Sequence, residues 1–151
     1  PCASARGGRK KGAAKEALGR SRGGFGTKIH AAVNECGQVI RLQLTGGERH
    51  DLCKANELIE DCTANHVVGD KGYDSDEFRK RIRRQKAKPA IPSRRNHRRR
   101  KCPKPIYRQR NIVERFFNRI KHFRRVATRF DKTLNSYLSW VCLASALVTL
   151  K

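Results

Sequence analysis

Acidic residues are scarce in this sequence, which has 13 Asp and Glu against 36 Lys and Arg and a formal net charge of +23. Solubility alone does not require so large an excess of cations. The excess predicts a polyanionic partner, because basic side chains that neutralise phosphate groups release condensed counterions. DNA, ribosomal RNA and an anionic membrane surface all satisfy this prediction.

Long apolar runs are also missing, which makes the membrane the weakest of the three partners. The longest stretch, residues 137–150, contains Ser139, Ser145 and Thr149. It is shorter than the roughly 20 residues that span a bilayer, so it predicts a buried terminal helix. The N-terminal residues also lack the apolar core of a signal peptide. We therefore expect a cytoplasmic protein with no membrane partner.

Closely spaced cysteines are absent as well. No two of the six cysteines are separated by the two to four residues that zinc loops use, and neither His66 nor His97 completes such a pattern. We expect reduced, unpaired thiols. No glycine-rich loop ends in Gly, Lys and Ser or Thr, so nothing points to a nucleoside triphosphate. We expect no small-molecule substrate.

The 151 residues fit one domain. Residues 1–24 are rich in Gly, Ala and basic side chains, without a helical or strand period, and predict a flexible basic loop. Residues 25–151 then form the domain. Short apolar or alternating runs predict strands over 27–34, 38–44, 66–68 and 88–91, with a hairpin at Gly37.

Helical spacing of apolar residues predicts helices over 51–62, from 74 onward with Phe78 and Ile82 buried, over 111–130 and over 134–150. This order of elements predicts an α/β fold with a hairpin at one edge and a parallel crossover. Residues 93–104 are strongly basic and predict a loop that is either disordered or ordered by DNA. Its candidate DNA contacts are Arg94, Arg95, Arg98, Arg99 and Arg100.

Acids are missing altogether between Glu77 and Glu114, while residues 79–110 contain sixteen Lys and Arg. Glu114 is thus a solitary carboxylate in a cationic stretch. On a helix, with Arg110 placed at zero, Glu114 lies near ~40°, Lys121 near ~20° and Tyr107 near ~60°, so the four share one polar stripe. The apolar residues Phe116, Ile120 and Phe123 fall on the opposite, buried side. An ordinary helical ion pair of Glu114 with Arg110 or Arg115 explains the same pattern.

Asp70 is the natural second carboxylate. It closely follows the apolar strand 66–68, and functional groups of α/β sheets gather at the carboxyl ends of strands. A simple turn residue is the alternative interpretation. Together, Asp70 and Glu114 could bind Mg²⁺ or Mn²⁺ through oxygen and leave positions for water and phosphate. Paired ions of this kind activate a nucleophile in phosphoryl transfer.

The series Tyr107, Arg110, Glu114 and Lys121, with two, three and six residues between them, resembles the signature of bacterial insertion-sequence transposases of the DDE class, families four and five. Residues 69–74 resemble the segment around that family's second aspartate, and residues 20–29 and 45–52 resemble its earlier strands and turn. The resemblance extends from about residue 19 to the C-terminus.

This resemblance implies a ribonuclease H-like mixed sheet flanked by helices, with two aspartates and a glutamate that bind the metal. Asp70 takes the place of the second acid and Glu114 of the third, while Tyr107, Arg110 and Lys121 contact DNA or orient the glutamate. It also implies cleavage and strand transfer of insertion-sequence DNA. The expected partner is double-stranded DNA of the bacterial nucleoid, bound by a homo-oligomer.

One departure concerns the first aspartate, which in the family lies on the first strand. No acid occurs before Glu16, and Glu16 lies in a Gly-rich segment that is a poor substitute for a strand. The sequence also begins at Pro1 rather than Met. We therefore expect an N-terminally truncated catalytic domain that lacks its first strand. A catalytically inactive remnant that only binds DNA through its basic surface, and an RNA-binding protein of ribosomal type, are the alternatives.

Overall fold

The computed structural model describes residues 17–21, 24–97 and 99–150. Its first sheet is antiparallel, with β1 (Gly19–Ser21), β2 (Gly24–Val33) and β3 (Val39–Gly46) in that order. The turn between β2 and β3 contains Gly37 at a φ of 80°, which glycine adopts readily because it has no Cβ. The Asn34 side chain closes this turn by accepting hydrogen bonds from the backbone N–H groups of Cys36 and Gln38.

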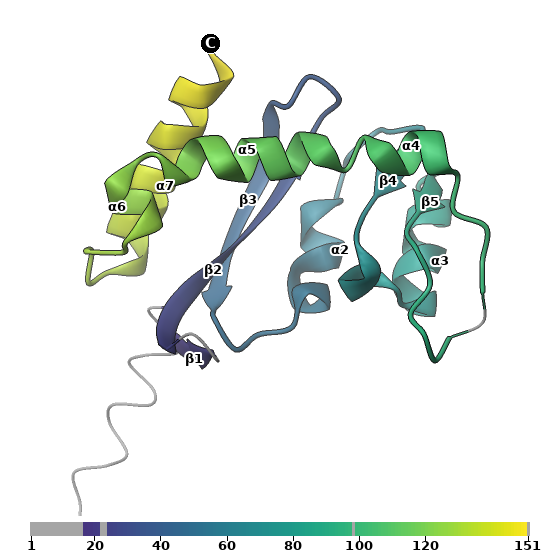
Figure 1. Cartoon of the computed structure of the whole chain (residues 1–151), viewed down its shortest axis with the longest axis horizontal. Helices are drawn as coiled ribbons and strands as arrows, with labels where there is room; N and C mark the ends of the chain where they lie inside the picture. The colour runs from purple at the N-terminus through teal and green to yellow at the C-terminus, as the bar shows by residue number, and fades with distance from the viewer. Residues whose placement is uncertain (1–16, 22–23, 98, 151) are drawn as a thin grey trace, which may run out of the picture.

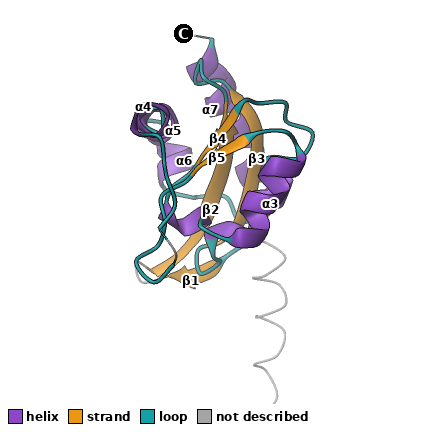
Figure 2. Ribbon diagram, turned by 90° about the vertical axis from the view of Figure 1, so that its right-hand side faces the viewer, coloured by secondary structure: helices purple, strands orange, loops and turns teal. Residues whose placement is uncertain are grey.

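The second sheet pairs β4 (His66–Val68) with β5 (Lys88–Ala90) in parallel. The connection between them contains α3 (Asp76–Arg84), so the predicted parallel crossover is confirmed. Ser75 begins α3 because its hydroxyl accepts a hydrogen bond from the backbone N–H of Phe78. Figure 2 shows β4 and β5 between α3 on one side and the pair α4 (Lys104–Arg108) and α5 (Asn111–Lys121) on the other.

The remaining helical elements are short, except for the helices over 111–121 and 134–149. They are η1 (Asp51–Lys54), α2 (Ala55–Leu58), η2 (Lys71–Tyr73), α4 (Lys104–Arg108), α5 (Asn111–Lys121), α6 (Arg124–Ala127) and α7 (Leu134–Thr149). Helices α4 and α5 run nearly end to end across one face of the molecule, from β4 to the hairpin of β2 and β3 (Figure 1). None of the helices in the described part of the chain is long and apolar enough to cross a membrane.

Two separate apolar cores hold these elements together. One packs α3, α2 and β5 around Phe78, Ile82 and Ile91, of which the first two were predicted to be buried. The other packs α5 and α7 against the β2–β3 hairpin around Phe116, Ile120 and Val141. Each sheet therefore has its own core.

Four predictions need correction. The predicted loop 1–24 contains strand residues, namely Gly19–Ser21 and Gly24, which pair in the first sheet. Apart from residues 17–18, the rest of that loop lies outside the described residues. The helix predicted over 51–62 is a 3-10 turn followed by a single short α-helix. The helix predicted over 111–130 ends at Lys121, since Phe123 adopts extended backbone angles and begins α6. Phe123, which was predicted to be buried, is 36% exposed because it lies at this break between α5 and α6.

The mixed α/β class is confirmed, but the strands do not form one sheet. Among the described residues, β4 pairs only with β5, and residues 27–33 of β2 pair only with β3. Among these residues, β4 is therefore an edge strand of one sheet, and β2 over residues 27–33 is an edge strand of the other.

Candidate active site

Asp70 lies where the sequence predicts it, at the carboxyl end of β4 and at the start of η2. It is half-buried, and its Oδ1 accepts a hydrogen bond of 2.8 Å from the backbone N–H of Gly72. This bond is that of a turn residue, and it also fixes the direction of the carboxylate. The turn interpretation and the site interpretation of Asp70 therefore describe the same geometry.

Asp51 is a second carboxylate at this place, which the sequence analysis missed. A Cβ added to Gly72 would lie 2.9 Å from Asp70 Oδ1 and 3.1 Å from Asp51 Oδ2, so both carboxylates face the same side of Gly72. Asp51 also forms an ion pair of 3.1 Å with Lys28 Nζ. Asp51 is the first residue of the predicted helix 51–62, and no local pattern links it to Asp70.

Asp51 and Asp70 both affect the pKa of the Tyr73 hydroxyl. Burial, and then the negative charges of Asp51 and Asp70, raise the pKa of the Tyr73 hydroxyl far above its ordinary value. The Tyr73 hydroxyl is therefore neutral at neutral pH.

Three of the four residues in the predicted polar stripe come together. Arg110 Nη2 lies 2.6 Å from Glu114 Oε1, and the Arg110 guanidinium lies 5.7 Å from the centre of the Tyr107 ring. Arg110 thus links α4 to the first turn of α5. Lys121 is exposed at the end of α5, about 10 Å further along the helix axis. The ion pair proposed as the simpler explanation for Glu114 is therefore present.

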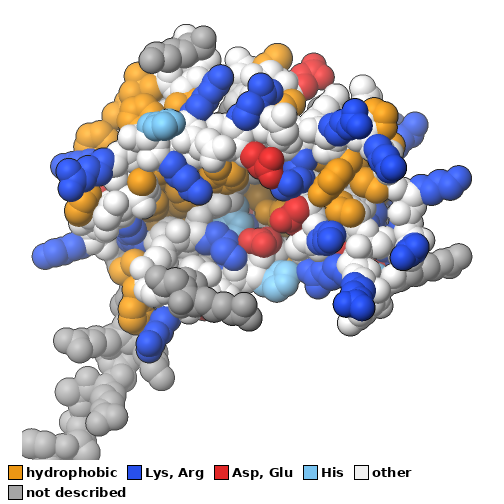
Figure 3. Space-filling model, in the orientation of Figure 1, with side chains coloured by type: hydrophobic (Ala, Val, Ile, Leu, Met, Phe, Trp, Pro, Cys, Tyr) orange, Lys and Arg blue, Asp and Glu red, His pale blue; other side chains and the backbone are white. Residues whose placement is uncertain are grey.

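Several acidic side chains gather on one face of the molecule (Figure 3). Helix α4 packs beside β4, the strand that leads to Asp70. Figure 3 shows acidic side chains gathered near the middle of the face that α5 crosses, with Lys and Arg side chains around them. In the described part of the chain no three His, Cys, Asp or Glu side chains stand close enough to hold a metal ion. The oxygen donors suit Mg²⁺, but they do not form a closed set of ligands.

The basic loop after β5 divides into two kinds of arginine. Arg94 and Arg100 turn inward and bond to the protein itself, Arg94 to backbone carbonyls and Arg100 to Asp76 and Asp74. Arg95 and Arg99 are exposed. Arg98 lies outside the described residues. Five cationic side chains and one proline line a hollow of about 470 Å³ beside this loop: Arg79, Arg83, Pro89, Arg99, Arg100 and Lys101.

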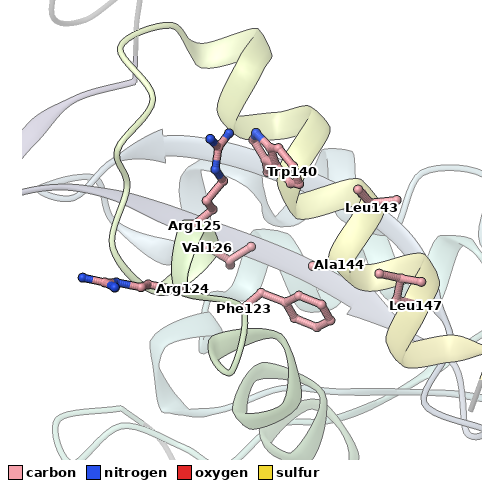
Figure 4. Close-up of a pocket in the computed structure, with 8 residues that line it drawn as sticks. All are labelled: Phe123, Arg124, Arg125, Val126, Trp140, Leu143, Ala144 and Leu147. Carbon is pink, nitrogen blue, oxygen red and sulfur yellow. The ribbon is translucent and has the colours of Figure 1, made fainter.

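A second hollow, of about 270 Å³, lies between α6 and α7 and is apolar. Figure 4 shows Phe123, Leu143 and Leu147 around it, with the Arg125 guanidinium over the Trp140 ring at 4.5 Å. Arg125 and Trp140 belong to α6 and α7, which lie at the opposite end of the molecule from β4 and β5 in Figure 1. This hollow therefore belongs to a different part of the molecule from the carboxylates.

Comparison with known proteins decides the family. Residues 3–149 match the family described as the transposase DDE domain. The chain belongs to this family of transposases. The transposase is also 33% identical over 129 residues to a Brucella ovis protein named as a transposase for insertion sequence element IS6501. That alignment covers 83% of this chain and 98% of the relative. No solved structure matches it.

Membership confirms the resemblance drawn from residues 69–74 and from the series that ends at Lys121. DDE transposase domains generally use divalent metal ions and act on DNA, which agrees with the predicted cofactor class and partner. Which residues of this transposase bind the metal and the DNA remains a prediction.

Proposed function

We propose that this transposase cleaves insertion-sequence DNA and joins the freed 3′ hydroxyl to target DNA, with Asp70 and Glu114 as two of its catalytic acids. One observation carries the proposal. Asp70 follows a parallel strand pair and has the carboxylate of Asp51 on the same side of Gly72. Carboxylates at the carboxyl end of a parallel strand form the kind of site that attracts a divalent cation.

Mg²⁺ or Mn²⁺ is the proposed cofactor, because carboxylate oxygens are its preferred protein ligands. When bound, such an ion lowers the pKa of the attacking group and neutralises charge on the phosphate. Asp70 and Glu114 are the proposed ligands. Glu114 is 51% exposed and paired with Arg110, so it is free to exchange this partner for the ion. Arg110 and Tyr107 are proposed to orient Glu114.

A ribonuclease H-like arrangement is the proposed fold of the complete catalytic domain. One further strand between β2 and β4 would pair with both edge strands and join the two sheets into a single mixed sheet. In the part of the chain that the structure describes, β2 over residues 27–33 pairs only with β3, and β4 pairs only with β5, which supports this arrangement. The first catalytic aspartate is proposed to lie on that strand.

The DNA backbone is proposed to bind along the cationic hollow beside α3. Arg83, Arg99 and Lys101 line it from two separate segments, and phosphate oxygens are suitable acceptors for all three. Arg95 and Lys121, both exposed, extend the proposed DNA surface. We further propose that the transposase acts as a homo-oligomer on bacterial nucleoid DNA in the cytoplasm.

The test is a nicking assay with Mg²⁺ on duplexes that carry the terminal inverted repeats of the element. The chain is assayed alone and with an aspartate-bearing strand fused to its N-terminus. Asp70→Asn and Glu114→Gln should each lower the nicking rate by about 100-fold or more, since a metal contributes several kcal/mol to the transition state. The control Glu77→Gln removes an exposed carboxylate at the start of α3 and should retain activity.

Nicking that is indifferent to both Asp70→Asn and Glu114→Gln would disprove the catalytic assignment. Salt-sensitive DNA binding without any nicking, in the fused and unfused chains alike, would favour the inactive remnant that only binds DNA.

A further inference from the structure

A buried carboxylate anchors the start of the basic loop. Asp74 is 1% exposed, and its Oδ1 accepts hydrogen bonds of 2.9 and 2.8 Å from Arg79 Nε and Nη2. Its Oδ2 accepts a bond of 2.8 Å from the backbone N–H of Arg94. Arg79 is itself 2% exposed and also donates to the Ile91 carbonyl. Buried charges persist only when they are paired in this way, so the backbone at Arg94 is firmly held.

From this anchor the Arg94 side chain reaches back to η2. Arg94 Nε donates to the Lys71 carbonyl at 3.0 Å, and Nη2 donates to the Gly72 carbonyl at 2.7 Å. The guanidinium is planar with its donors in a fixed fork, so two bonds fix the direction of both carbonyls.

The bond to Lys71 has a direct consequence for Asp70. The Lys71 carbonyl and the Gly72 N–H belong to one peptide group, which is planar and rigid. Arg94 holds the carbonyl end of this group, and the N–H end donates to Asp70 Oδ1 at 2.8 Å. The direction of the Asp70 carboxylate is therefore connected to Arg94 through a single rigid unit.

We infer that Arg94 is a positioning residue for Asp70 and not a DNA contact, although the sequence places it in the basic loop with the DNA-binding candidates. Arg94 orients the Lys71–Gly72 peptide, and Asp74 with Arg79 fixes Arg94. The inference rests on the proposed role of Asp70 as a catalytic acid. It separates Arg94 from its neighbour Arg95, whose side chain is exposed.

The test compares Arg94→Ala with Arg95→Ala in the full chain. The first readout is hydrogen exchange of the Gly72 amide. Arg94→Ala should speed this exchange about fivefold or more, since it removes the guanidinium hydrogen bond to the Lys71 carbonyl of the same peptide group. Arg95→Ala removes the same charge one residue further along and should leave the exchange unchanged.

The second readout is binding to a short duplex DNA without metal, measured against salt. Each phosphate contact that is lost lowers the slope of log affinity against log salt by about one. Arg94→Ala should leave this slope unchanged. The third readout is the Mn²⁺ concentration that half-saturates the protein, which should rise about tenfold in Arg94→Ala and stay unchanged in Arg95→Ala.

Unchanged Gly72 exchange in Arg94→Ala, or a lower salt slope, would overturn the inference. If Arg94→Ala does not fold, Arg94→Lys decides the question, since it keeps the charge but cannot bridge the two carbonyls. Faster Gly72 exchange without any Mn²⁺ binding, even in the unsubstituted protein, would support the positioning role of Arg94 and count only against the metal site at Asp70.

Discussion

His30 is the buried titratable residue of the β2–β3 hairpin. It is 2% exposed, and its Nε2 lies 2.8 Å from the Thr45 hydroxyl on the neighbouring strand. Burial lowers the pKa of His30 below the ordinary 6.5; Lys28 and Lys54 act in the same direction, and Asp51 opposes them. The folded protein therefore keeps this imidazole neutral under conditions in which the unfolded chain would protonate it.

This difference predicts a loss of stability in mild acid. Below pH 6.5 the unfolded state binds a proton at His30 that the folded state does not bind, so the free energy of unfolding decreases as the pH falls toward the lowered pKa. Urea denaturation at a series of pH values measures the decrease. His30→Gln keeps a hydrogen-bonding side chain next to Thr45 without a titrating group, and should give a flatter profile in this range.

His122→Gln, at an exposed histidine, is the control and should keep the slope of the unsubstituted protein. Stability that increases between neutral pH and pH 5 would contradict the prediction.

Asp74 affects stability in a separate, more acidic pH range. Burial alone would raise its pKa, but the hydrogen bonds from Arg94 and Arg79 lower it below 3.8. Its contribution is therefore present above 3.8 and is lost as the pH falls through the lowered pKa.

Helix α7 is the longest helix of the structure and is apolar around most of its surface. Its inner face packs Val141 and Ala144 against α5, while Leu143 and Leu147 on the outer face are about half exposed. Thr133 begins the helix by accepting a hydrogen bond from the backbone N–H of Ser136. The contact with α5 belongs to the second core, to which α5 contributes the buried Phe116 and Ile120.

We predict that Ile120→Ala destabilises the protein by about 2–5 kcal/mol, the usual effect of removing a fully buried aliphatic side chain. Ile120 is 0% exposed, so its loss leaves a cavity between α5 and α7. The control is Leu143→Ala on the exposed face of α7, which should change stability by no more than about 0.5 kcal/mol. Chemical denaturation of both variants measures the difference, and equal effects would show that α5 and α7 do not share a core.

At the scale of the whole molecule, the charge of +23 is spread over a chain of only 151 residues, and part of it is already used within the protein. Arg79, Arg94 and Arg100 bond to Asp74, to backbone carbonyls or to Asp76. The cations that remain for DNA are fewer than the sequence implies. Arg99 and Lys101, which line the cationic hollow, are among them.

We predict that duplex DNA affinity decreases steeply with salt, by roughly one counterion for each phosphate contacted. The double variant Arg99→Ala, Lys101→Ala should lower the slope of log affinity against log salt by about two. Lys132→Ala, in the exposed segment between α6 and α7 at the opposite end from α3, should leave it unchanged (Figure 1). A flat salt response of the unsubstituted protein would rule out electrostatic DNA binding.

The sequence by itself determined the charge, the strand at 66–68, the strand predicted over 88–91 that ends at Ala90, the burial of Phe78 and Ile82, and the position of Asp70 after a strand. These properties depend on composition and on the spacing of apolar residues over a few positions, both of which are local. The family signature in the second half of the chain is local too, and the match over residues 3–149 confirmed it.

Only the tertiary structure decided which charges face one another. Asp51 lies beside Asp70, and Arg94 turns inward while Arg95 stays exposed. A run of arginines looks uniform in sequence. Whether a guanidinium faces the solvent or the protein depends on which distant carbonyl or carboxylate lies within hydrogen-bonding distance of it. That distance is fixed by how the two cores pack, and residue spacing along the chain contains no information about it.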